Sequence, residues 1–274
     1  MTEAQWPQDR RITIGDLQAA TDCGERWTML TAYDALTARV FDSAGVRALL
    51  VGDTAGMVVF GYDDTVPVTQ EQLLPLVQAV VRGTEHALVV ADLPFGSYQS
   101  GPVAALSAAA RYMKEGGAQA VKLEGGEHVL PQVMRIVESG IPVMGHLGLT
   151  PQSVNMLGGL RRVQGRGQDG DRLLEDALAL EAAGAFAVVL EAVPASLGAR
   201  VADALRIPVV GIGAGPDVDA QILVWQDMAG LTPGRLPRFV KRYADIGGEL
   251  ARAASAYVAD VATGRYPSME HSYG

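Results

Sequence analysis

The sequence has one cysteine, Cys23, and few aromatic residues, which make up 6% of its 274 positions. A single cysteine excludes intrachain disulfide bonds and any metal cage built from cysteine side chains. Nothing in this composition indicates an oxidising compartment, so the cytoplasm is the default location. The shortage of aromatic side chains disfavours a surface on which nucleic-acid bases stack.

Positive charge is also in deficit. The chain has 22 lysines and arginines against 31 acidic residues, which gives a formal net charge of −9. That sign opposes binding to nucleic-acid phosphates and to anionic membranes. No apolar run approaches the roughly 18 residues of a membrane span, and residues 5–22 do not form a signal peptide. We therefore expect neither nucleic acid nor a membrane as a partner.

Short apolar segments of strand length alternate along the chain with amphipathic segments rich in alanine and leucine. Strands that alternate with helices predict a parallel sheet, and strands that are apolar throughout have both faces covered. Seven predicted strands are clear, and an eighth is less regular because Trp225 and Gln226 interrupt it. They span residues 27–31, 48–51, 87–91, 120–123, 142–145, 187–190, 208–212 and 222–226.

Eight such units within one domain length favour an α/β fold of the (β/α)8 TIM-barrel type over a doubly wound open sheet. No proline- or serine-rich linker divides residues 1–274, so we predict a single domain. Helices are predicted at 106–115 and 171–183, and a new helix after Thr150-Pro151. An N-terminal segment at 12–20 and a C-terminal amphipathic extension at 239–262 lie outside the barrel, where each either caps it or docks on a neighbour.

A polar side chain follows five of the apolar runs: Asp53, Asp92, Glu124, His146 and Glu191. In a barrel the carboxyl ends of the strands meet at one mouth, so these side chains are expected in one pocket. Any one of the acids is about as well explained as a cap on the next helix. Four acids at four strand ends favour a site, whereas a lone histidine is more often structural.

Three buried carboxylates at one mouth, those of Asp53, Asp92 and Glu124, require a cation to offset their charge. Mg²⁺ suits oxygen ligands, and with few protein ligands it leaves positions for a 2-oxo acid that binds through two oxygens. The metal would stabilise an enolate. Lys122, on the same strand face as Glu124, would add positive charge near the developing oxyanion or the carboxylate.

Two glycine-rich segments each allow two structural interpretations. Residues 211–215 (GIGAG) form either a phosphate-binding loop or, more in keeping with Pro216 directly after it, a tight turn with close backbone packing. The loop 158–170, which carries Arg161, Arg162 and Arg166, is either a lid that contacts anions or a merely solvated loop.

Ten motifs, in order and over nearly the whole chain, resemble the ketopantoate hydroxymethyltransferase (3-methyl-2-oxobutanoate hydroxymethyltransferase) family. They are TAYD (31–34), VGDTAGM (51–57), PVT (67–69), ADLPF (91–95), VKLEGG (121–126), GHLGLTPQSVN (145–155), QGRG (164–167), VLEAVP (189–194), GIGAG (211–215) and EHSY (270–273). The resemblance implies a barrel of the phosphoenolpyruvate/pyruvate type that assembles into a homo-oligomer, a decamer.

The resemblance also implies a reaction: a hydroxymethyl group passes from 5,10-methylenetetrahydrofolate to 3-methyl-2-oxobutanoate through a Mg-stabilised enolate. The products are 2-dehydropantoate (ketopantoate) and tetrahydrofolate, in pantothenate and coenzyme A biosynthesis. Asp53, Asp92 and Glu124 are the implied Mg²⁺ ligands and Glu191 the base. Asp53, Thr54, Asp92, Lys122 and His146 are the implied substrate-binding residues, and His146 and Tyr33 are candidates to orient substrate or water.

Two rival interpretations remain. Another metal-dependent 2-oxo acid lyase or mutase on the same barrel would share the acids. Lyases of that type have a different loop pattern that contains a cysteine, whereas the one cysteine of this chain, Cys23, precedes the first predicted strand. A noncatalytic barrel is the rival from another class. The folate-binding residues, the physiological metal and the symmetry of the oligomer are left open.

Overall fold

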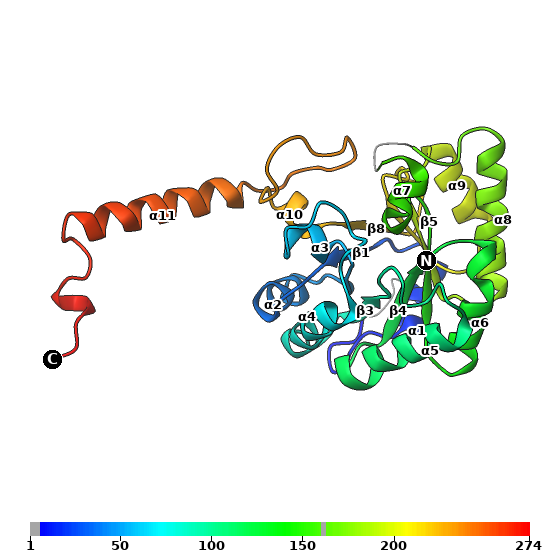
Figure 1. Cartoon of the computed structure of the whole chain (residues 1–274), viewed down its shortest axis with the longest axis horizontal. Helices are drawn as coiled ribbons and strands as arrows, with labels where there is room; N and C mark the ends of the chain where they lie inside the picture. Colours follow the sequence, from blue (N-terminus) through cyan, green and yellow to red (C-terminus); the bar gives the residue numbers. More distant parts are fainter. Residues whose placement is uncertain (1–5, 160–162) are drawn as a thin grey trace. The chain divides into compact units, whose positions relative to one another are not determined.

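The computed structural model describes residues 6–159 and 163–274. Eight parallel strands form a closed barrel in chain order, with β8 paired to β1 (Figure 1). The strands are β1 (Trp27–Thr31), β2 (Ala48–Val51), β3 (Leu88–Asp92), β4 (Ala120–Glu124), β5 (Val143–Gly148), β6 (Ala187–Glu191), β7 (Val209–Ile212) and β8 (Ala220–Leu223). The predicted (β/α)8 architecture is confirmed.

Two compact units divide the chain, Met1–Leu223 and Val224–Gly274. We describe each unit by itself, and the single-domain boundary over the whole chain stays a prediction. Residues 160–162, which include Arg161 and Arg162 of the predicted lid, lie outside the described residues.

Most strand boundaries follow the apolar runs, but the eighth prediction was wrong in its second half. β8 ends at Leu223, and α10 (Trp225–Met228) begins where the strand was predicted to continue. The pairing of Ala220 with both Trp27 and Val210 fixes β8 two residues earlier than its apolar pattern indicates. Four strands, β3 to β6, end later than predicted. Ladder partners on a neighbouring strand hold their last residues, Asp92, Glu124, Gly148 and Glu191, in extended backbone.

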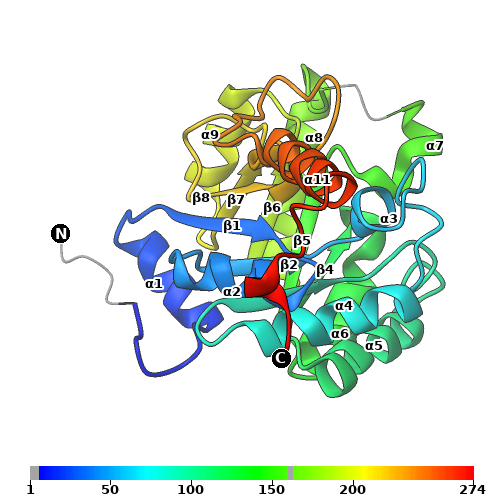
Figure 2. The ribbon, with the colours of Figure 1, turned by 90° about the vertical axis from the view of Figure 1, so that its left-hand side faces the viewer.

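Helices follow the strands and cover the outside of the barrel, where α5 and α6 lie side by side (Figure 2). The predicted helix at 106–115 is α5 (Pro102–Arg111) continued by a π-helix (Tyr112–Gly116), and that at 171–183 is α8 (Gln168–Ala182). The other helices that follow strands of the barrel unit are α2 (Ala35–Ser43), α3 (Ala55–Val58), α4 (Gln70–Gly83), α6 (Leu130–Glu138), α7 (Val154–Leu157) and α9 (Ala195–Ala204).

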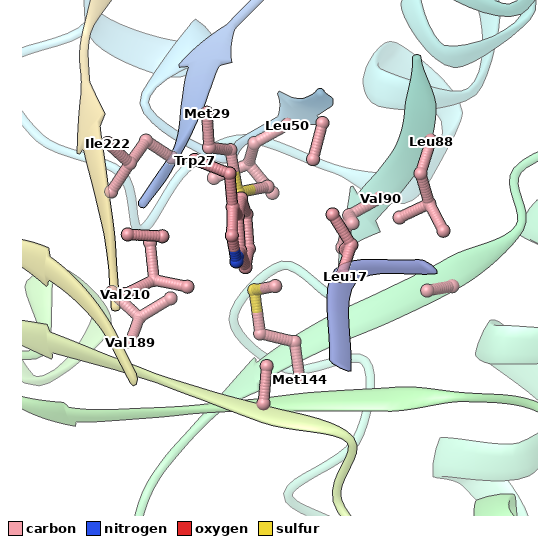
Figure 3. Packing of buried hydrophobic residues seen from close by; sticks show 14 of the residues in the cluster. Leu17, Trp27, Met29, Leu50, Leu88, Val90, Met144, Val189, Val210 and Ile222 are labelled. Atoms are coloured by element: carbon pink, nitrogen blue, oxygen red, sulfur yellow. The ribbon is translucent and has the colours of Figure 1, made fainter. Parts of the chain in front are cut away.

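The N-terminal helix α1 (Ile14–Asp22) closes one end of the barrel interior. Its Leu17 is fully buried and belongs to one apolar cluster with residues of the strands, including Trp27 and Met144 (Figure 3). A capping box formed by Thr13 and Asp16 begins the helix and satisfies its first free N–H groups. The capping role is therefore the one that the N-terminal segment fills.

The C-terminal unit contains α11 (Ile246–Ala262), which begins seven residues later than the amphipathic pattern predicts. Asp245 caps the helix by accepting a hydrogen bond from the Gly248 N–H. The preceding residues are held instead by α10, since the Tyr243 N–H donates to the Met228 carbonyl oxygen at 2.8 Å. None of the described helices in either unit has the length and apolarity that a membrane crossing requires.

Candidate active site

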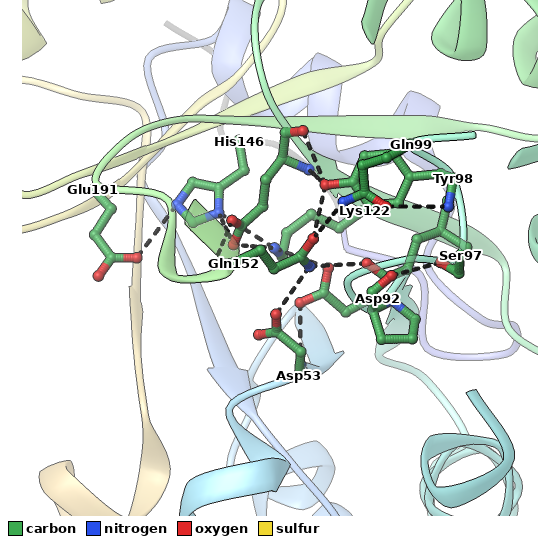
Figure 4. Close-up of polar contacts among 12 residues, drawn as sticks. Asp53, Asp92, Ser97, Tyr98, Gln99, Lys122, His146, Gln152 and Glu191 are labelled. Carbon is green, nitrogen blue, oxygen red and sulfur yellow. Dashed lines mark hydrogen bonds and ion pairs between the residues drawn. The ribbon is translucent and has the colours of Figure 1, made fainter. Parts of the chain in front are cut away.

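Side chains from five neighbouring strands meet at the carboxyl end of the barrel (Figure 4). Asp53 follows β2, Asp92 ends β3, Lys122 and Glu124 lie on β4, His146 on β5, and Glu191 ends β6. The first five are buried, whereas the side chain of Glu191 keeps 18% of its surface exposed. The structure therefore brings together the residues that the strand-end pattern predicted, from positions up to 138 residues apart in the numbering (191 − 53).

Lys122 contributes positive charge to this group. Its Nζ lies 2.9 Å from Asp92 Oδ1, 3.8 Å from Glu124 Oε1 and 3.3 Å from His146 Nδ1. Burial opposes the charged form of Lys122, but the carboxylates of Asp92 and Glu124 outweigh it and raise its pKa. Lys122 therefore stays charged and offsets part of the negative charge of the site.

Negative charge nevertheless exceeds what Lys122 offsets. Burial raises the pKa of Asp53, and the carboxylates of Asp92 and Glu124 raise it further. Burial also raises the pKa of Asp92 against the opposing effect of Lys122. For Glu124 the effect of burial is outweighed by His146 and Lys122, and its pKa is lowered. A further cation bound here would relieve the penalty on both aspartates.

The donor set fits a hard divalent metal. Asp92 Oδ1 and Glu124 Oε1 are buried and accept no well-aligned hydrogen bond, although each faces a basic side chain. Among the residues in the described ranges, no three histidine, cysteine, aspartate or glutamate side chains are already arranged to hold one ion. Water or substrate oxygens would have to complete the coordination, as is usual for Mg²⁺.

His146 connects this group to Glu191. Its Nδ1 lies 3.2 Å from Glu124 Oε1, and its Nε2 lies 3.3 Å from Glu191 Oε2, too poorly aligned to count as a full hydrogen bond. Burial and Lys122 lower the pKa of His146, but the two carboxylates outweigh them and raise it to about 9. A charged imidazole between them holds the Glu191 carboxylate toward the pocket.

The backbone around Glu191 is closely fitted. Ala192 is the described non-glycine residue with positive φ, at 50°, and its N–H donates to the Ile212 carbonyl oxygen at 2.8 Å. On the other side, a Cβ at Gly148 would overlap the Glu191 carbonyl oxygen. Ala192 and Gly148 together fix the backbone position from which the Glu191 side chain extends.

The other predicted residues have clear positions. Thr54 begins α3, and its side chain makes no capping hydrogen bond there. Tyr33 is buried just after β1. In the loop after β7, Gly215 has a φ of 90°, and a Cβ on it would lie 2.8 Å from Ala195 Cα, which supports the tight-turn interpretation of GIGAG.

Two residues of the site were not predicted. Gln152 and Tyr98 are buried and hydrogen-bonded to the acidic group, on a 3-10 helix (Pro151–Ser153) after β5 and on the loop after β3. The sequence pattern identified polar side chains directly at the ends of the predicted strands. Gln152 and Tyr98 lie several residues after a strand end, so that signal did not find them.

Comparison with known proteins shows the family to which the chain belongs. The family model described as ketopantoate hydroxymethyltransferase matches residues 11–269. A 3-methyl-2-oxobutanoate hydroxymethyltransferase of Frankia casuarinae is 66% identical over 97% of this chain and 90% of its own length. The enzyme of the same name from Thermobifida fusca is 62% identical, over 97% of this chain and 94% of its own.

Solved structures with the same fold are more distant. Phosphonopyruvate hydrolase in complex with oxalate and Mg²⁺ matches with a TM-score of 0.61 and 14% identity, over 95% of this chain and 93% of that one. A 2,3-dimethylmalate lyase of the PEP mutase/isocitrate lyase superfamily matches with a TM-score of 0.59 and 16% identity, over 100% of this chain and 93% of that one. At such identities the likeness shows the fold alone.

Proposed function

Because the chain belongs to the ketopantoate hydroxymethyltransferase family, we propose specific roles for its site residues in making ketopantoate from 3-methyl-2-oxobutanoate. The chain is a 3-methyl-2-oxobutanoate hydroxymethyltransferase of pantothenate biosynthesis, and methylenetetrahydrofolate supplies the one-carbon unit. The observation that carries the role assignment is the buried group of three carboxylates around Lys122, with Glu191 held beside it by His146.

Asp53, Asp92 and Glu124 would hold a Mg²⁺ ion. The raised pKa of Asp53 and Asp92 and the orphaned oxygens of Asp92 and Glu124 support this proposal. When bound, the ion would polarise the keto oxygen of the substrate and stabilise negative charge on it.

The 2-oxo acid would bind against Lys122, whose ammonium group attracts both the carboxylate and the oxygen on which charge develops. Asp53, Thr54 and Asp92, which lie at or just after the ends of β2 and β3, would complete the substrate-binding set together with His146. His146 would also keep the Glu191 carboxylate directed at the substrate, since it contacts Glu191 through Nε2.

Glu191 would remove the C3 proton of 3-methyl-2-oxobutanoate. Its partial exposure leaves an oxygen accessible to substrate, whereas the other acids are buried. The electron pair left at C3 forms the new bond to the methylene carbon of the folate donor, both bonds from that carbon to folate nitrogens break, and water supplies the hydroxyl group. The C3 proton, held on Glu191, and the second proton of the water end on the two nitrogens of tetrahydrofolate. A positioned carboxylate contributes about 10²–10⁴-fold to such a transfer.

We expect Asp53→Ala and Asp92→Ala each to abolish metal binding and metal-dependent binding of the keto acid. Each removes a carboxylate that the ion needs, while Asp203→Ala, an exposed control on α9, leaves the surroundings of the site intact. In the parent protein, Mg²⁺ at 100 times its Kd should add about 2.7 kcal/mol to the free energy of unfolding.

The measurements are calorimetric titration and thermal melting with and without Mg²⁺. Exchange of the C3 proton in D₂O, followed by product formation with methylenetetrahydrofolate, tests the complete reaction. Unchanged metal affinity in both alanine variants would refute the ligand assignment, and a parent protein without exchange would refute the enzyme mechanism at its first step.

We further propose that the chain forms a homo-oligomer through α11. Within the C-terminal unit this helix carries an apolar stripe with helical spacing, and none of its residues is buried. The stripe consists of Ile246, Leu250, Tyr257 and Val261, of which Leu250 is 57% exposed. The number of copies and the cytoplasmic location stay predictions.

Leu250→Asp is therefore expected to weaken self-association at least about tenfold, because it places a charge in the stripe. Ala259→Asp makes the same charge change on the opposite side of α11 and should leave assembly unchanged. Sedimentation velocity at micromolar concentration measures both. Equal sedimentation of parent and Leu250→Asp would exclude this stripe from the interface.

A further inference from the structure

Gln152 is a buried residue, 4% exposed, that contacts two of the three carboxylates at once. Its backbone N–H donates to Glu124 Oε2 at 3.0 Å, and its side-chain Nε2 donates to Asp53 Oδ2 at 2.9 Å. These two acids belong to different strands and lie 28 and 99 residues away in sequence. One residue thus connects the ends of β2 and β4 to the segment after β5 (Figure 4).

The surroundings fix the orientation of the Gln152 amide. Its Nε2 also donates to the Leu93 carbonyl oxygen at 2.9 Å, and a carbonyl can only accept. Its Oε1 accepts from Gln99 Nε2 at 3.3 Å and lies 2.8 Å from the Tyr98 hydroxyl. That hydroxyl also lies 3.0 Å from the Glu124 carbonyl oxygen and accepts from the Glu124 N–H at 3.2 Å. The N–H group of Gln152 is held toward Asp53 from both ends of the amide.

The hydrogen bonds divide the oxygens of each carboxylate in the same way. One oxygen accepts from an uncharged N–H: Asp53 Oδ2 and Glu124 Oε2 from Gln152, and Asp92 Oδ2 from the Asp53 N–H at 3.1 Å. On Asp92 and Glu124 the other oxygen faces Lys122. An uncharged donor can orient a carboxylate in this way without offsetting the charge that a cation would use.

We propose that Gln152 is a positioning residue that sets which oxygens of Asp53 and Glu124 face the bound metal ion. This inference rests on the proposed function, since it takes the carboxylates to be metal ligands. Tyr98 and Gln99 are the partners on the oxygen side of the Gln152 amide. Neither Gln152 nor Tyr98 touches the reacting atoms, so both act through the carboxylates.

The test is the affinity of the metal-free protein for Mn²⁺, measured by calorimetric titration without substrate. Gln152→Met keeps an unbranched side chain of similar length and the backbone N–H, but it removes the side-chain N–H from Asp53. We expect Mn²⁺ affinity to fall about tenfold to a hundredfold, as is usual when an outer partner of a metal ligand is lost. Tyr98→Phe, which leaves the amide but removes one of the two partners of its oxygen, should cost about threefold.

Gln132→Met is the matched control, because Gln132 is also buried, 6% exposed, but lies on α6 outside this hydrogen-bonded group. It should leave Mn²⁺ affinity unchanged whatever it does to the melting temperature. In the double variant Tyr98→Phe/Gln152→Met, the loss of Mn²⁺ affinity should be smaller than the product of the two single effects, because both changes remove the contact between Tyr98 and Gln152.

The outcomes are distinguishable. A parent protein that does not bind Mn²⁺ refutes the metal site of the proposed function, on which this inference rests. If the parent binds and Gln152→Met binds equally tightly while melting at a lower temperature, Gln152 is only structural and the inference is wrong. If Gln152→Met does not fold, Tyr98→Phe decides, and unchanged Mn²⁺ affinity in that variant overturns the inference.

Discussion

Replacing Glu191 by glutamine is expected to slow exchange of the C3 proton of 3-methyl-2-oxobutanoate by about a thousandfold while the variant still binds the keto acid. Glutamine keeps the size of the side chain and an oxygen that faces His146, but its amide cannot take a proton from carbon. The assigned role is that of a general base, for which losses of about 10²–10⁴-fold are typical.

Proton exchange is followed by NMR in D₂O with saturating Mg²⁺, and binding of the keto acid by calorimetry on the same samples. Glu138→Gln, an exposed glutamate at the end of α6, is the control for the change of charge. Retained exchange in Glu191→Gln would assign the base to another residue. Lost exchange together with lost binding would show that Glu191 supports the pocket rather than the proton transfer.

Lys122→Met is expected to lower the free energy of unfolding of the metal-free protein by about 3–5 kcal/mol and to abolish binding of the keto acid. The Lys122 ammonium group contacts two carboxylates and His146 at 3.8 Å or less, so its removal leaves buried negative charge without its cation. Methionine fills a similar volume, and the loss therefore reports the charge rather than a cavity.

Urea unfolding at pH 7.5 measures the effect on stability. The free energies of unfolding of parent and variant are compared with the same m-value, which is the slope of that free energy against urea concentration. The control is Lys114→Met on the π-helix after α5, where the side chain is exposed and a change within about 0.5 kcal/mol is expected. A Lys122→Met protein as stable as its parent would mean that the carboxylates of the site are already protonated and do not depend on Lys122.

Much of the fold followed from the sequence because its signals are local. Strand-length apolar runs predicted seven strands well, and a polar residue at each of five strand ends predicted which side chains would meet. The eighth strand was misplaced because pairing with β1 and β7, rather than its own apolarity, sets its start at Ala220. The late start of α11 likewise depends on hydrogen bonds to α10 that no local pattern reveals.

Within the site, the residues that act through other residues were the ones missed. Gln152 has an ordinary local context after Thr150-Pro151, and its importance arises only when Asp53, 99 residues earlier, is folded against it. Asp92 and Glu124 show the opposite case, since each stands at the end of an apolar strand and barrel closure alone determines where its side chain goes.

The close fit around Glu191 has a consequence for how this pocket can evolve. A lineage could exchange the side chain at position 191 by one substitution, but shifting it by one residue along β6 would turn it to the other face of the strand. Gly148, Ala192 and the hydrogen bond to Ile212 would all have to change with it. New chemistry is therefore more accessible to descendants of this barrel through altered side chains than through relocated ones.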